Sequence, residues 1–335
     1  MDFRKYPSIE NTYRKKTLDY LIAQGLTKGE FVVQEKAHGA NFSFWYDGNE
    51  LKSGKRTGFI ADDFYDYKPV EEKCQDKVKQ LYSLLKQMDY DVDVLIIYGE
   101  LIGGTYPHQD VKKDTLATRI QKGIFYSPHN EFYAIDVSVN EMLLDIDTFT
   151  RVMKKTGFLF ARTIFRGTFE ECLNYPNTFS SQISVWAGFP QIEDNVCEGI
   201  VIKPATPLFL SDNSRVILKN KNEKWAEKAK KKDRVKKKAP ALSESCNKLC
   251  NDIENFITEN RLHNVLSKTG SIAQKEFGKL IHLFSQDILD DFYKDHLKAY
   301  KALEKKEQKQ LTKQMNKSAA VLIRSNFQNI VDGNY

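Results

Sequence analysis

The chain has 335 residues, of which 41% are hydrophobic and 12% aromatic, and its formal net charge is +6. This length and composition predict a folded protein with room for two domains, each with a core of its own. Charged residues open the sequence, no apolar run approaches the ~18 residues of a membrane span, and the five scattered cysteines fit neither a disulfide framework nor a zinc site. We therefore expect a cytoplasmic protein without a membrane partner.

Helix and strand patterns alternate along the chain up to about residue 221. Apolar residues recur at helical spacing in some segments, while β-branched and aromatic runs bounded by turn residues predict strands. The expected helices are Thr17–Ile22, Pro69–Met88, Leu143–Lys155 and Glu170–Leu173. The expected strands are Phe31–Val33, Asn41–Tyr46, Leu51–Gly58, Val92–Tyr98, Phe132–Val137, Glu198–Pro204 and Arg215–Lys221.

The last third of the chain has a different character. It follows a lysine-rich stretch between Lys219 and Lys238, and from Leu242 onward apolar residues recur at helical intervals with little strand signal. We predict one domain at residues 1–230, a basic linker at 231–242 and a helical domain at 243–335. A lysine-rich stretch is most often a solvated linker, and a polyanionic partner is the alternative.

Several charged residues stand at the ends of the expected strands. Lys36 follows a strand beside Gly39, Lys55 and Arg56 return on the hairpin partner, and Glu100 follows another strand. Glu198 and Lys203 flank a third strand, and Lys219 and Lys221 share one face of its neighbour because side chains alternate along a strand.

Together these residues predict a lysine that attacks the α-phosphate of a nucleotide. A lysine is a nucleophile only as the neutral amine, which neighbouring cations and a divalent metal favour by charge repulsion. The same positive charges would stabilise negative charge that develops on the phosphoryl oxygens. One or two carboxylates with waters and phosphate oxygens suit Mg²⁺, which assigns Glu198 to a metal and leaves Glu100 as a second candidate ligand.

The motif order resembles that of the covalent nucleotidyltransferases, and more narrowly the phage-type RNA ligase 2 family, which includes the kinetoplastid RNA-editing ligases. The motifs are Lys36-x-His38-Gly39-x-Asn41, Lys55-Arg56-Thr57-Gly58, Tyr98-Gly99-Glu100, Phe132-Tyr133-Ala134-Ile135-Asp136, Glu198-Gly199-x-Val201-x-Lys203-Pro204 and Val216-x-x-Lys219-x-Lys221. The likeness continues into the helical third and so covers nearly the whole chain. DNA ligases and capping guanylyltransferases carry a strand-rich OB domain there instead.

The resemblance implies an α+β fold in which an antiparallel-sheet nucleotidyltransferase domain precedes a small all-α domain. It implies an ATP-dependent RNA ligase that joins RNA 3′-hydroxyl and 5′-phosphate ends through lysyl-AMP and adenylylated RNA, at nicks in duplex RNA. The cofactors would be ATP, as AMP donor, and Mg²⁺, with Mn²⁺ as an alternative. The protein would act as a monomer, in the cytoplasm of the host cell if it is phage-encoded.

The resemblance also implies a role for each motif residue. Lys36 would be the nucleophile, and Lys219 and Lys221 would act on the phosphates. The remaining nucleotide contacts would be Glu35 at the adenine edge, Arg56 and Glu100 at the ribose, Ile135 at the base, Asn41 near the metal, and Lys203. For Asp136 and Lys203, a supporting ion pair and a direct contact both stay open. Glu198 would bind the metal, and Tyr6, His38, Lys55 and Arg166 would engage the RNA.

Two positions depart from the family pattern. Ile135 stands where the family has an aromatic residue that stacks on adenine, and Gln34 stands where it often has an arginine. For His38, both a hydrogen bond that holds the loop and a part in the later steps stay open. The alternative functions are a DNA ligase, a capping-type guanylyltransferase and a noncatalytic RNA-binding module, and the last leaves Glu100 and Glu198 unexplained.

Overall fold

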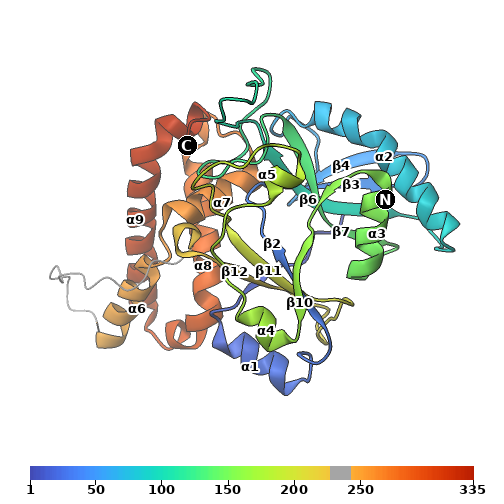
Figure 1. Cartoon of the computed structure of the whole chain (residues 1–335). Helices are drawn as coiled ribbons and strands as arrows, with labels where there is room; N and C mark the ends of the chain where they lie inside the picture. Colours follow the sequence, from blue (N-terminus) through green and yellow to red (C-terminus); the bar gives the residue numbers. More distant parts are fainter. Residues whose placement is uncertain (227–242) are drawn as a thin grey trace. The chain divides into compact units, whose positions relative to one another are not determined.

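The computed structural model describes residues 1–226 and 243–335, which form two compact units, Met1–Lys224 and Trp225–Tyr335 (Figure 1). The linker predicted at 231–242 lies outside the described residues, and the domain bounds set by it stay a prediction. Within the described residues, no helix combines the length and the apolar character needed to cross a membrane.

The first unit contains two sheets. The five-stranded sheet has the order β1 (Glu10–Asn11), β12 (Leu218–Lys221), β11 (Gly199–Pro204), β2 (Phe31–Glu35) and β10 (Thr163–Gly167). The larger sheet has the order β5 (Gly58–Phe59), β4 (Leu51–Lys55), β3 (Ala40–Tyr46), β6 (Leu95–Gly103), β7 (Asn130–Val139) and β8 (Met142–Leu143), with β9 (Leu159–Phe160) beside β7. All pairs are antiparallel except β1 with β12 and β7 with β9.

Alternation along β3 explains how the larger sheet is covered on both faces. Phe42 and Phe44 point into the main core, which α2 (Lys68–Gln87) and α3 (Ile146–Thr156) close (Figure 1). Trp45 points the other way and packs with Tyr6 from the N-terminal segment. The three remaining helices of this unit are α1 (Lys15–Ala23), α4 (Phe169–Leu173) and α5 (Ile183–Trp186), with η1 (Glu223–Trp225) at its end.

The second unit is helical throughout its described residues. Its helices are α6 (Glu244–Glu254), α7 (Glu259–Thr269), α8 (Phe277–Lys301) and α9 (Lys305–Val331), with a short η2 (Gln274–Glu276) before α8. Each helix contributes an apolar stripe to a separate core. Ser243 and Thr258 cap α6 and α7, because each hydroxyl accepts a hydrogen bond from a backbone N–H of the first turn.

The predicted fold class is confirmed: antiparallel sheets form the first unit and helices the second. Several predicted bounds are wrong. The strand expected at Val92–Tyr98 runs instead from Leu95 to Gly103, so Glu100 lies inside it, opposite Asn41 of β3. The helix expected from Leu143 starts at Ile146, because Leu143 pairs in β8 and Asp145 caps the helix. The strand expected from Arg215 begins at Leu218.

Candidate active site

The segment after β2 is held at three points. The Lys36 N–H donates to the Gly199 carbonyl at 3.0 Å, and the His38 N–H donates to the Tyr126 hydroxyl at 2.9 Å. Gly39 lies so close to β6 that a Cβ there would stand 2.3 Å from the Leu101 carbonyl oxygen. The backbone that carries Lys36 is therefore fixed on both sides of the lysine.

Glu198 lies at the centre of the charged residues. Its carboxylate is fully buried, and its oxygens stand 2.7 Å from Lys36 Nζ and 2.6 Å from Lys221 Nζ. Burial opposes ionisation, but Lys221 and Lys36 hold the pKa of Glu198 well below its usual value. His38 Nδ1 lies 3.6 Å away. Glu198 is therefore an ionised carboxylate that links the nucleophile candidate with a second lysine.

The surroundings of Lys36 differ from those expected from the sequence. We expected neighbouring cations to favour the neutral amine, whereas the closest charged partner is the Glu198 carboxylate. The Lys36 amine donates a hydrogen bond to this carboxylate at 2.7 Å. The amine must therefore leave Glu198 before its lone pair can attack a phosphate.

The topology of the small sheet brings the motif residues together. Strand β11 lies between β2 and β12 and is antiparallel to both. The end of β2, the start of β11 and the end of β12 therefore lie side by side, which brings Lys36, Glu198 and Lys221 together. Lys219 pairs with Val201 and Lys221 with Gly199 in the ladder, which leaves both lysines on one face of β12.

Glu100 supplies a second carboxylate beside Glu198. Burial, followed by the repulsion of Glu198, raises the pKa of Glu100 to about 7, against the attraction of Lys36 and a hydrogen bond from Asn41. The described residues contain no group of three or more His, Cys, Asp or Glu side chains arranged for a metal. One or two carboxylates are nevertheless the usual protein share of a magnesium site, so Glu198 and Glu100 fit a hard divalent cation.

A pocket opens beside Lys36. Its lining comprises Tyr6, Ile9, Gln34, Glu35, Lys36, Ala37, Glu100, Ile135, Asp136, Ala161, Val201, Lys203 and Ile217. A pocket that combines apolar side chains with polar and charged ones is typical of a small-molecule site. Ile135, which replaces the family's aromatic residue, is part of this lining.

The Glu35 carboxylate contacts a different part of the chain. Its two oxygens accept hydrogen bonds from the Ser181 hydroxyl at 2.5 Å and the Gln182 N–H at 2.8 Å. Burial raises the pKa of Glu35 to about 7, even though both hydrogen bonds oppose the shift. Glu35 thus ties β2 to the segment before α5, and its contact with the adenine edge stays a prediction.

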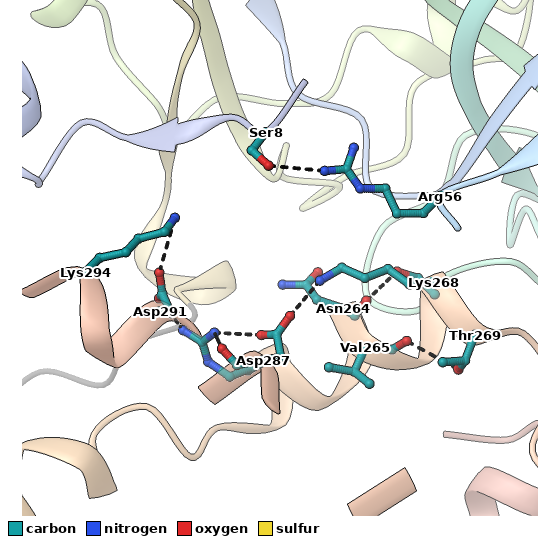
Figure 2. Close-up of polar contacts among 11 residues, drawn as sticks. Ser8, Arg56, Asn264, Val265, Lys268, Thr269, Asp287, Asp291 and Lys294 are labelled. Atoms are coloured by element: carbon teal, nitrogen blue, oxygen red, sulfur yellow. Dashed lines mark hydrogen bonds and ion pairs between the residues drawn. The ribbon is translucent and has the colours of Figure 1, made fainter. Parts of the chain in front are cut away.

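Four buried side chains form an ionic cluster at one wall of the pocket. Asp136 accepts hydrogen bonds from Lys203 Nζ at 2.8 Å and Arg215 Nη1 at 2.7 Å, and the Tyr6 hydroxyl donates to it. Arg56 holds the same N-terminal segment: it donates to the Tyr6 carbonyl and, at 3.3 Å, to Ser8 Oγ (Figure 2). Tyr6 and Lys203 are thus engaged inside the fold, and Arg56 contacts the N-terminal segment.

Two predicted RNA contacts lie outside the pocket lining. Lys55 Nζ stands over the Phe64 ring at 5.4 Å from its centroid. Arg166 forms ion pairs with Asp147 at 2.5 Å and Glu30 at 3.3 Å. The structure therefore does not bring these two cations to the pocket beside Lys36, and their contacts with RNA stay predictions.

Sequence reasoning missed three residues that support the site. Tyr126 holds the His38 backbone, Ser181 holds Glu35, and Arg215 neutralises Asp136. Only Arg215 gave a signal, as a cation at the start of an expected strand. Tyr126 and Ser181 lie in irregular segments, where no periodicity shows the direction of a side chain.

Comparison with known proteins gives matches over most of the chain. The RNA ligase family model matches residues 29–221, and the T4 RNA ligase 2 C-terminal model matches residues 240–321. RNA-editing ligase 1, mitochondrial, of Trypanosoma brucei brucei is 27% identical over 362 residues, which cover 88% of this chain and 76% of that protein. RNA-editing ligase 2, mitochondrial, of Trypanosoma brucei brucei is 26% identical over 351 residues, which cover 88% of this chain and 83% of that protein.

Solved structures give a more distant match. A Naegleria gruberi RNA ligase mutant with ATP and Mn aligns with a TM-score of 0.43 and 14% identity. The alignment covers 67% of this chain and 58% of that one. Both trypanosome relatives are mitochondrial by name, and the cytoplasmic location expected from this sequence stays a prediction.

Proposed function

Because the chain belongs to the RNA ligase family, we propose that it is an ATP-dependent ligase that joins RNA 3′-hydroxyl and 5′-phosphate ends, at nicks in duplex RNA. One observation carries the proposal: Lys36, on a fixed backbone at a mostly apolar pocket, is paired at 2.7 Å with a fully buried carboxylate that also contacts Lys221. A lysine that is merely a solvated surface charge would not need a buried carboxylate partner beside a pocket.

In the first step, the Lys36 amine attacks the α-phosphorus of ATP. A nitrogen–phosphorus bond forms, the bond to the β-phosphate oxygen breaks, and pyrophosphate leaves with the electron pair. Lys219 and Lys221 lie on one face of β12, where their charges would stabilise the phosphoryl oxygens. Lys36 would attack as the neutral amine after its proton passes to solvent, and Glu198 would keep Lys221 as a partner when Lys36 moves away.

A divalent cation would be held by Glu198 and Glu100, and when bound it would add positive charge beside the amine and the phosphate. Glu198 has acceptor capacity for this role, since each carboxylate oxygen offers two lone-pair sites and the two lysines occupy only part of them. Asn41 orients Glu100 through their hydrogen bond across β3 and β6. We propose Mg²⁺ as this ion, with Mn²⁺ as an alternative.

In the second step, an RNA 5′-phosphate oxygen attacks the adenylate phosphorus, and the Lys36 nitrogen leaves. In the third, an RNA 3′-hydroxyl attacks the 5′-phosphate and AMP leaves. Both steps depend on positioning, since reacting atoms have to be held about 3–3.5 Å apart. Among the residues proposed to act on RNA, His38 has its Nδ1 3.6 Å from the Glu198 carboxylate that pairs with Lys36.

We further propose a division of labour within the chain. None of the residues assigned to ATP lies beyond Lys221, so residues 1–230 would carry out adenylylation, and residues 243–335 would add contacts with RNA. The second unit brings no carboxylate or lysine of the motif series. Its role would be in the steps that need RNA ends in place.

The test is a sealing assay on the full chain, with ATP, Mg²⁺ and end-labelled nicked duplexes. We expect a nick between RNA strands to be sealed, ATP to be used in preference to GTP, and labelled AMP to appear on the 5′ end as an intermediate. Equal or faster sealing of an all-DNA nick would favour the DNA ligase alternative. Transfer of label from GTP alone would favour the guanylyltransferase.

A further inference from the structure

Four lysines form a single stripe along α9. Lys305, Lys309, Lys313 and Lys317 recur every four residues and are all exposed. The core-facing residues of the same helix, Leu311, Met315 and Ala319, follow the same interval with an offset of two residues. Two residues turn an α-helix by about 200°, so the lysines project from the side opposite to the core.

This lysine stripe lacks the acidic partners that lysines on a solvated helix face commonly have. None of the four has an Asp or Glu three or four residues away, and none forms an ion pair with another described residue. Like charges four residues apart destabilise a helix, whereas alternating Lys and Glu would stabilise it. The opposite arrangement occurs in the same unit, where Asp287 and Asp291 pair with nearby cations, Lys268 and Lys294 among them (Figure 2).

The stripe belongs to a strongly basic segment of the second unit. Residues 294–317 contain eight lysines and three carboxylates, a net +5, and the whole chain carries +6. Local charge of one sign attracts a polyanion at long range and raises its association rate. The stripe thus presents four exposed positive charges on one side of α9.

We propose that the lysine stripe of α9 binds the phosphate backbone of the RNA substrate, an inference that rests on the proposed function. The lysines lie about 6 Å apart and about 18 Å end to end along the helix axis, at a rise of about 1.5 Å per residue. On a duplex with a rise of about 3.4 Å per nucleotide, 18 Å corresponds to about five phosphates of one strand. The stripe presents no aromatic residue for base stacking, so the contact reads the backbone and not the sequence.

The test compares RNA binding by three forms of the full chain without ATP: the natural protein, the variant K305Q/K309Q/K313Q/K317Q, and a control, K15Q/K16Q/K28Q/K79Q. The control removes the same charge from four exposed lysines that form no ion pair with a described residue and do not line the pocket. The probe is a fluorescent nicked RNA duplex, titrated between 50 and 200 mM salt. Glutamine is a good helix former, so circular dichroism should show α9 intact in all three forms.

We expect the slope of log K against log salt to be less negative by about 2 to 4 in the stripe variant, because each phosphate contact contributes about −0.9 to this slope. The control should lose less than half of that. Unchanged binding by the stripe variant, or an equal change in the control, would overturn the inference. A second assay, labelling with ATP in the absence of RNA, separates the two proposals. If none of the three forms becomes covalently labelled with AMP, the proposed function is refuted. The binding comparison would still show whether the lysine stripe binds RNA.

Discussion

Replacing Tyr126 by phenylalanine tests whether the backbone next to Lys36 has to be held from outside the motif. The substitution keeps the buried ring and removes the oxygen that accepts the His38 N–H at 2.9 Å. An N–H that loses its partner in a buried site costs about 1–3 kcal/mol. We expect the free energy of unfolding to fall by that amount and kcat for adenylylation to fall with it, while KM for ATP changes little.

Tyr133→Phe is the matched control. Tyr133 is as deeply buried as Tyr126, but its hydroxyl has no hydrogen-bond partner among the described residues. Removing it should leave the free energy of unfolding within about 0.5 kcal/mol of the natural protein. Urea denaturation and the rate of covalent AMP formation on both variants make the comparison. Equal losses in the two variants, or none in Tyr126→Phe, would refute the role of Tyr126 as a positioning residue.

Three further changes have defined outcomes. Lys221→Ala should slow covalent AMP formation by ~10²-fold or more, because it removes a charge that stabilises the phosphoryl oxygens, and a near-normal labelling rate would contradict this assignment. Gly39→Ala should lower the free energy of unfolding by about 1–3 kcal/mol because of the Leu101 carbonyl, whereas Gly58→Ala, whose Cβ would meet no atom within 4 Å, should not. The pKa of Glu35 is raised from 4.5 to about 7, so the folded state binds this proton more tightly than the unfolded state does. The contribution of Glu35 to the free energy of unfolding is therefore fully present below pH 4.5 and is lost as the pH rises to about 7. The loss is about 3 kcal/mol, and urea denaturation across this range should show a flatter profile for Glu35→Gln; identical profiles would count against a raised pKa.

The sequence identified residues whose backbone positions follow from strand pairing. Lys36, Glu198 and Lys221 meet because β2, β11 and β12 are neighbours, and the hydrophobic runs of these strands are visible in the sequence. The family predicted from the motif order is confirmed by the match over residues 29–221. The roles of the individual residues stay predictions.

Side-chain partners could not be predicted in the same way. Tyr126 lies 88 residues from His38, and Ser181 lies 146 residues from Glu35, both in segments without a regular period. The partner of Lys36 was also missed, because the motif pattern assigned Glu198 to a metal and gave no sign of its ion pair with Lys36. A buried carboxylate needs a charged or hydrogen-bonding partner, and Lys36 is one such partner of Glu198.

The most direct test of Lys36 as the nucleophile is to identify the residue that carries AMP. The full chain is incubated with labelled ATP and Mg²⁺, denatured, digested and analysed by mass spectrometry, beside a Lys36→Arg variant. Arginine keeps the positive charge but offers no neutral amine, so we expect one AMP on Lys36 of the natural protein and none on the variant. AMP on another residue, or on the Lys36→Arg protein, would contradict the assignment of Lys36 as the nucleophile.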